Sequence, residues 1–134
     1  MRFSEAKNRK VISTTGAKTV GRLSEFVVDP RTAHVVALKL RKAEGKGNTL
    51  SWNHMKSFGQ DAIIVESAEM IRSAEGDLAA LCDKRRRMLG KRILTERGDE
   101  VGRVKDVEFD PDSGLVRAVI TDGPEIDGQR IRYD

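Results

Sequence analysis

The sequence has little cysteine, few aromatic residues and no long apolar run. Its single cysteine, Cys82, excludes an intramolecular disulfide and any metal site made only of cysteines. No apolar stretch approaches the roughly 20 residues that span a bilayer, and the N-terminus lacks the apolar segment of a signal peptide. We therefore expect a cytoplasmic protein with no integral membrane segment. Aromatic residues make up only 4% of the chain, which predicts a modest core of Val, Ile, Leu and Ala.

The charged residues are abundant but unevenly divided along the chain. Residues 1–70 carry 12 Lys and Arg against 7 Asp and Glu, whereas residues 92–134 carry 7 against 11. One part is therefore basic and the other acidic. This asymmetry favours oriented contacts between the two parts, or between chains, over a uniformly basic nucleic-acid binder.

The chain contains an internal repeat with an offset of 81 positions. Residues 10–53 lie over residues 91–134 without a gap, and 12 of these 44 positions are identical. A match of this length indicates two copies of one supersecondary unit. The longest shared stretches are Val20-Gly21-Arg22 with Val101-Gly102-Arg103, and Asp29-Pro30 with Asp110-Pro111.

Each copy is rich in strand-forming residues that are separated by turn signals. Asp-Pro at 29–30 and at 110–111 is typical of a type I turn. Apolar parity changes within 21–25 and within 102–106, which predicts a β-bulge beside Gly21 and Gly102. We expect Phe26, Val28, Val107 and Phe109 to be buried. The expected strands are 10–14, 20–28, 34–41, a short strand ending on Trp52, and 61–66, then 101–109, 115–121 and a short strand ending on Tyr133.

A helix is expected between the copies, over residues 73–89, with Ser73 as its N-cap and Gly90 at its end. The predicted domains are a first unit at 1–70, a linker helix at 71–90 and a second unit at 91–134. The second unit stops soon after Tyr133 and so lacks the last strand of the first. We expect its open edge to be covered by the first copy or by its equivalent in a homodimer. The linker helix and residues beyond Asp134 in a longer natural protein are further candidates for that cover.

These features together resemble the PRC-barrel superfamily. The resemblance rests on Val-Gly-Arg, Asp-Pro and the step Leu50-Ser51-Trp52, which recurs as Ile131-Arg132-Tyr133. It implies an all-β protein with one linking helix, made of two small PRC-barrel-like β-barrel units in tandem. Members of the family include the cytoplasmic domain of the photosynthetic reaction centre H subunit and the C-terminal domain of a ribosome maturation factor. The resemblance implies an interaction or assembly module without shared catalytic residues.

No pattern in the sequence predicts a catalytic, cofactor or metal site. The two histidines, His34 and His54, have no second ligand at a metal-binding spacing. Cys82 lies on the apolar face of the predicted helix, which is typical of a packing residue rather than a nucleophile. The alternating acids Asp106, Glu108, Asp110 and Asp112 suit a solvated strand face better than a calcium site.

Six basic residues are the candidate interaction surface. Arg22 and Arg103 recur beside glycine in both copies, and either a ligand contact or a bond to Glu25 and Asp106 would explain them. The run at the end of the predicted helix would bind phosphate groups or simply complement the helix dipole. That run is Lys84, Arg85, Arg86 and Arg87.

We interpret the sequence as a non-enzymatic interaction or assembly module that binds another macromolecule, with a protein as the first choice of partner and a homodimer as possible. The alternative is an RNA- or ribosome-associated factor that uses the basic first unit and Lys84–Arg87. Binding that weakens steeply with salt would favour the alternative.

Overall fold

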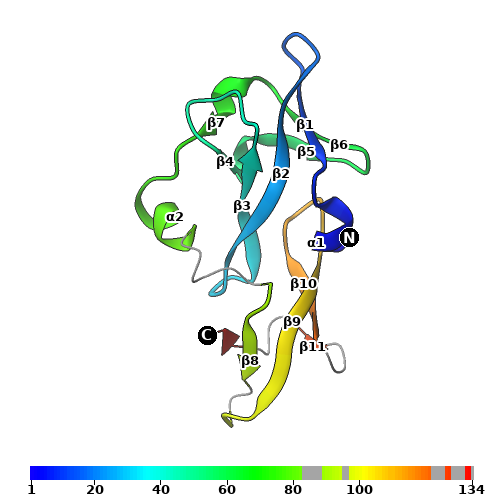
Figure 1. Cartoon of the computed structure of the whole chain (residues 1–134), viewed down its shortest axis with the longest axis vertical. Helices are drawn as coiled ribbons and strands as arrows, with labels where there is room; N and C mark the ends of the chain where they lie inside the picture. The colour runs from blue at the N-terminus through cyan, green and yellow to red at the C-terminus, as the bar shows by residue number, and fades with distance from the viewer. Residues whose placement is uncertain (83–88, 95–96, 122–125, 128–131, 134) are drawn as a thin grey trace.

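The computed structural model describes residues 1–82, 89–94, 97–121, 126–127 and 132–133 of the chain. Within these residues the first copy forms a seven-stranded sheet in the order β5-β6-β1-β2-β3-β4-β7. The sheet curls strongly into half a barrel, in the upper part of Figure 1. Its elements are α1 (Phe3–Ala6), β1 (Lys10–Ser13), β2 (Lys18–Asp29), β3 (His34–Arg41), β4 (Thr49–Ser51), the 3₁₀ turn η1 (Trp52–His54), β5 (Met55–Phe58), β6 (Ala62–Val65), the 3₁₀ turn η2 (Ala68–Met70) and β7 (Ile71–Arg72).

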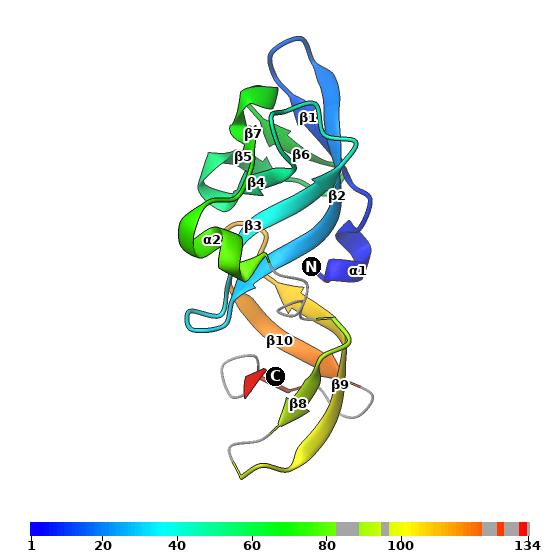
Figure 2. The same cartoon turned by 60° about the vertical axis from the view of Figure 1, so that its left-hand side comes forward.

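The second copy forms a smaller sheet, which in the described residues has five strands in the order β11-β10-β9-β8-β12. It lies below the first sheet in both views, with α1 beside the junction (Figures 1 and 2). The expected all-β fold of two tandem units is confirmed. The remaining elements are α2 (Gly76–Leu81), β8 (Arg92–Leu94), β9 (Glu100–Phe109), β10 (Val116–Thr121), β11 (Ile126–Asp127) and β12 (Arg132–Tyr133).

The two copies share the same irregularities in their long hairpins. In the first copy, pairing of β2 with β3 skips Ser24, and in the second copy pairing of β9 with β10 skips its counterpart Lys105. The predicted bulges are therefore confirmed. An extra residue reverses the side-chain parity of a strand, which explains why Leu23 and Val104 are buried together with Val28 and Phe109.

The ungapped equivalence predicted from the repeat is wrong for the first strand of each copy. Lys10 lies opposite Arg22, so the ungapped repeat would place Lys91 opposite Arg103. Instead Arg92 lies there, and β8 is therefore shifted by one residue relative to the repeat. The reason is the length of the turn. The paired residues Ile12 and Thr19 enclose residues 13–18, whereas Leu94 and Glu100 enclose only 95–99.

The last strands of the copies also differ. In the first copy β4 pairs with β3, and β6 runs parallel to β1 on the other side of the sheet. In the second copy β12, which contains the counterparts of Ser51 and Trp52, pairs with β8 in the antiparallel direction. The β12 strand therefore takes the place beside β8 that β6 takes beside β1. The prediction that residues 10–53 and 91–134 form like units holds for the long hairpins and for the strand beside each, since β11 pairs with Ala118 and Val119 as β4 pairs with their counterparts Ala37 and Leu38. It fails for β12.

The helices differ from the prediction as well. The connecting helix α2 begins after Glu75, not Ser73, and Glu75 makes no side-chain capping hydrogen bond. Residues 83–88 of the predicted helix lie outside the described residues. The first two residues of the predicted linker form β7, which pairs with β4 and extends the first sheet. Helix α1 was not expected, and it buries Phe3 and Ala6.

One hydrophobic core runs through both copies. It joins Leu23, Leu38 and Leu50 of the first copy to Val107 and Phe109 of the second. Of the four residues expected to be buried, Val28, Val107 and Phe109 are buried, but Phe26 is only half-buried. Its ring covers the side of the core, stacked on Phe3 with centroids 3.9 Å apart.

Candidate interaction surfaces and the joint between the copies

The two copies meet where β3 and β10 begin. The backbone N–H of Val35 donates to the carbonyl of Gly114 at 2.8 Å, and the N–H of Val116 donates to the carbonyl of Ala33 at 2.7 Å. Between these bonds His34 lies opposite Leu115 in an antiparallel bridge. Each of these residues is the counterpart of one across the joint, so the backbone pairing has local two-fold symmetry.

The N-terminus reinforces this joint from the side of β9. The Met1 ammonium donates to the Phe109 carbonyl at 3.1 Å, and the Phe109 N–H donates to the Met1 carbonyl at 2.8 Å. Asp106 is only 8% exposed and accepts hydrogen bonds from the N–H and the hydroxyl of Ser4. The start of the chain therefore acts as a short extra strand that holds the second copy in place.

Phe109 makes an apolar contact between the copies. It is 1% exposed and lies among the rings of the first copy. Its centroid is 5.0 Å from that of Phe26, 5.4 Å from Phe58 and 6.4 Å from Trp52. Tilted and edge-to-face geometries of this kind are favourable for aromatic pairs. The second copy thus completes the first copy's core instead of resting on its surface.

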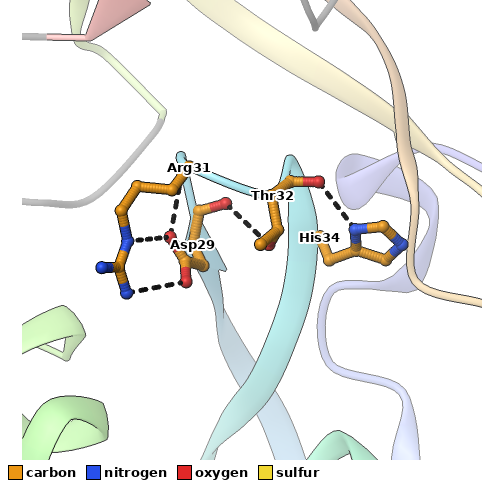
Figure 3. A network of polar contacts seen from close by, with 4 residues as sticks. All are labelled: Asp29, Arg31, Thr32 and His34. Carbon is orange, nitrogen blue, oxygen red and sulfur yellow. Dashed lines mark hydrogen bonds and ion pairs between the residues drawn. The ribbon is translucent and has the colours of Figure 1, made fainter.

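The Asp-Pro turns hold the paired segments in position. Asp29 accepts from the Arg31 N–H at 2.9 Å and from its guanidinium, while the His34 ring donates to the Thr32 carbonyl at 2.7 Å (Figure 3). Burial of Asp29 disfavours its charged form, but the Arg31 bonds outweigh this effect and lower its pKa. In the second copy, Asp110 is bonded in the same way by the Asp112 N–H at 2.8 Å.

A groove lies at the other edge of the first sheet, around β4 and β7. It consists of two adjoining cavities of about 580 and 490 Å³ that share Lys46 and Arg72, and we call it the β4–β7 groove. Half-buried Met70 and Leu78 give it apolar walls. Exposed residues of both positive and negative charge line the groove. These are Lys46, Arg72, Glu44, Glu69 and Glu75, with His54 beside them.

Comparison with protein-family models gives one result that matches the topology. The model of the PRC-barrel domain matches residues 1–70 and 83–133, which is most of the chain and covers both copies. The chain belongs to the PRC-barrel domain family. A comparison with curated proteins finds no match. Each PRC-barrel match contains one long hairpin with its bulge and its Asp-Pro turn, so the family resemblance inferred from the sequence is confirmed.

The recurring arginines of the two PRC-barrel copies have a backbone role. Arg22 donates to the carbonyl of Asn8 at 3.2 Å, and Arg103 donates to the carbonyl of Gly90 at 3.1 Å. Both carbonyls belong to residues with positive φ just before the first strand. Asp106, the expected partner of Arg103, accepts from Ser4 instead. The repeated Val-Gly-Arg motif therefore fixes how the chain enters each unit.

The predicted solvated acidic face is wrong for Asp106, which is buried at the joint. Its neighbour Glu108 lies opposite Arg2 in a bridge, and Asp110 is engaged in its turn and with Arg117 at 2.8 Å. Within the described ranges, no group of three or more His, Cys, Asp or Glu side chains is placed to hold a metal ion.

The other candidates are placed as follows. Lys84, Arg85, Arg86 and Arg87 lie outside the described residues. Cys82 is half-buried, and burial raises the pKa of its thiol, which suits packing better than nucleophilic chemistry. Across the part of the chain that the structure describes, no helix has the length and apolar character needed to cross a membrane.

Sequence reasoning missed Ser4, Gly114 and the β4–β7 groove. Ser4 is an exposed serine in a short helix, and nothing local distinguishes it. A Cβ at Gly114 would lie 3.1 Å from Trp52, and this close approach depends on the tertiary fold. The groove is formed by a loop at 44–48, by β7 and by α2, which come together only when the sheet curls.

Proposed function

We propose that this PRC-barrel protein is a non-enzymatic interaction or assembly module that binds another protein in the β4–β7 groove. The family provides the first support, because PRC-barrel domains are generally non-catalytic binding modules. The groove provides the second, because two cavities of about 580 and 490 Å³ that share Lys46 and Arg72 form one continuous site with both apolar and charged walls.

The composition of the groove suits a protein partner. Protein interfaces combine an apolar centre with a polar rim. Here Met70 and Leu78 supply apolar contact, and the rim carries both cations and carboxylates. A nucleic-acid site would instead be lined by cations, since most of its contacts are to phosphates.

Lys46 and His54 indicate the chemistry of the partner. Both side chains are exposed, and among the described contacts neither the Lys46 ammonium nor the His54 ring has a hydrogen bond or ion pair. Arg72 uses its Nε to donate to the Glu69 carbonyl at 3.1 Å, which fixes its guanidinium at the groove. A partner segment with an acidic side chain next to an apolar one would complement this arrangement.

Affinity capture with the full chain tests the proposal. The double variant Lys46→Glu/Arg72→Glu reverses the two positive charges that line both cavities of the groove. The control Lys7→Glu/Lys56→Glu makes the same charge change at exposed sites outside it. We expect the amount of partner protein captured by the groove variant to fall about tenfold or more, and the amount captured by the control to stay unchanged. Equal capture by both variants would contradict the proposal.

The basic first copy supports a second candidate, an RNA- or ribosome-associated role that uses Lys84–Arg87 as well. Residues 1–70 carry an excess of Lys and Arg. Nuclease treatment distinguishes the candidates, because capture through RNA would be abolished by nuclease and would fall steeply as salt is raised. Capture that survives both treatments supports a protein partner.

A further inference from the structure

The joint between the copies is made by the same segment of each copy. Residues 33–35 pair with residues 114–116, and these are counterparts in the repeat. Ala33 accepts from Val116, while Gly114, the counterpart of Ala33, accepts from Val35, the counterpart of Val116. A contact in which one patch meets its own copy is isologous, which is the geometry of two-fold dimers.

The side chains at the joint are not symmetric, however. Phe109 fills the aromatic cluster of the first copy, but its counterpart there is the smaller Val28. Trp52 packs so closely against Gly114 that a Cβ at this position would lie 3.1 Å from the indole Cε2. The backbone symmetry therefore allows any two copies to pair, while the side chains favour a first copy with a second copy.

Charge adds to this preference. The first copy is basic and the second is acidic, and opposite charge favours unlike pairs over like pairs. At the joint itself, the acidic side of the contact is Asp106 of the second copy, and the donors are the Ser4 N–H and hydroxyl of the first.

None of these contacts requires the two copies to belong to one chain. The described hydrogen bonds and ring contacts of the joint join residues before β6 to residues within 106–116, and β7 and β8 are connected by residues 73–91. We infer that two chains of this protein form a dimer by exchanging their second copies. In that dimer, the 114–116 segment of each chain pairs with the 33–35 segment of the other.

Concentration controls this exchange because the same contacts form in both states. The single chain is favoured by the effective concentration of its linked copies, which for short linkers is about 1 mM. The exchanged dimer should therefore be minor at micromolar concentration and should rise in proportion to protein concentration. The joint segments 33–35 and 114–116 do not line the β4–β7 groove, so the test of this dimer is distinct from the test of the proposed function.

Single cysteines at the centre of the joint test the exchange in the full chain. His34 and Leu115 lie opposite each other, and opposed residues of an antiparallel pair are at a separation that suits a disulfide. In a Cys82→Ala background, His34→Cys chains are mixed with Leu115→Cys chains, unfolded together, refolded at several concentrations and oxidised. A chain with both substitutions is the geometric control.

We expect the mixture to give a covalent dimer between the two kinds of chain. While the dimer is scarce, the fraction of chains in it should rise about tenfold for a tenfold rise in protein concentration. The control should close a disulfide within one chain at low concentration. The inference is overturned if the control closes but the mixture gives no dimer. A dimer of His34→Cys chains alone that equals the mixed yield would also overturn it, because first copies would then pair with each other. Failure of the control to close would contradict the joint itself.

Discussion

The two copies keep the same backbone devices but differ in the strands at their edges. Both have a skipped residue at Ser24 or Lys105, and in both an arginine bonds to a backbone carbonyl before the first strand. In contrast, β6 runs parallel to β1 at the edge of the first copy, whereas β12 runs antiparallel to β8 at the same place in the second. The residues that recur in the sequence are therefore those that set backbone geometry, while the edges have diverged.

A second contrast lies at the joint, where counterpart positions carry side chains of different size. The second copy inserts Phe109, and the first copy supplies the rings around it. The first copy has Ala33 at the left-handed position where the second has Gly114. The difference teaches that the copies are specialised for each other, and substitutions at paired positions should have unequal effects.

The largest expected effect is at Phe109. Its replacement by Ala removes a buried ring from a cluster to which both copies contribute, and we expect the free energy of unfolding to fall by about 3–5 kcal/mol. The counterpart Val28→Ala should cost less, about 1–2 kcal/mol, because fewer buried atoms are removed. Urea unfolding of both variants measures the difference, and equal losses would contradict the proposed asymmetry.

The next largest effect is at Gly114. Its φ of 81° is unfavourable for other residues, and an added Cβ would lie 3.0 Å from the Val35 carbonyl and 3.1 Å from Trp52. We expect Gly114→Ala to cost about 2–4 kcal/mol. Ala33 already has a φ of 54°, so Ala33→Gly should be close to neutral. Thermal melts of the two variants test this, and comparable losses would show that the two turns are under the same constraint.

A smaller contrast is expected between Gly102 and Gly21. Gly102 has a φ of 147°, which costs other residues about 1–3 kcal/mol. Gly21 is not in that region, and its added Cβ would meet the flexible end of Leu40 at 3.3 Å. We expect Gly102→Ala to be clearly destabilising and Gly21→Ala to have about half the effect or less. Chemical denaturation of both variants would reveal the reverse order if the backbone account is wrong.

The smallest effect is a dependence on acid pH. The pKa of Asp29 is lowered by Arg31 and that of Asp110 by the Asp112 N–H and Arg117, so folding favours the ionised forms. The stabilisation is complete above the unfolded pKa of about 3.9 and is lost as the pH falls through the lower folded values. Melting temperatures between pH 6 and pH 3 should decline less in Asp29→Asn and Asp110→Asn than in the parent chain. Parallel declines would contradict a role for these carboxylates.

The sequence predicted the parts of the fold that local chemistry controls. Asp29-Pro30 and its counterpart marked the second turns, and the change of parity after Gly21 marked the bulge. The offset between β1 and β8 was not predictable from the identical residues. Lys91 and Ile93 match Lys10 and Ile12 in residue type, but because the turn is one residue shorter they do not occupy the same pairing positions.

The candidate surfaces were harder to predict because they are tertiary. Asp106 alternates with other acids and so looked solvent-exposed, yet Ser4, far away in the sequence, covers it. The β4–β7 groove combines a loop, a two-residue strand and a short helix, and no periodicity connects them. The burial of Phe109 was expected from strand parity, but not that its neighbours are rings of the other copy.

The pairing of residues 33–35 with 114–116 is the central claim, and nuclear Overhauser contacts across it test this pairing most directly. In the native chain at low concentration, we predict contacts between the backbone protons of His34 and Leu115 and slow exchange of the Val35 and Val116 amide protons. Both amides should exchange only when the whole protein unfolds. Absence of these contacts, with rapid exchange of both amides while the two sheets remain folded, would contradict the account.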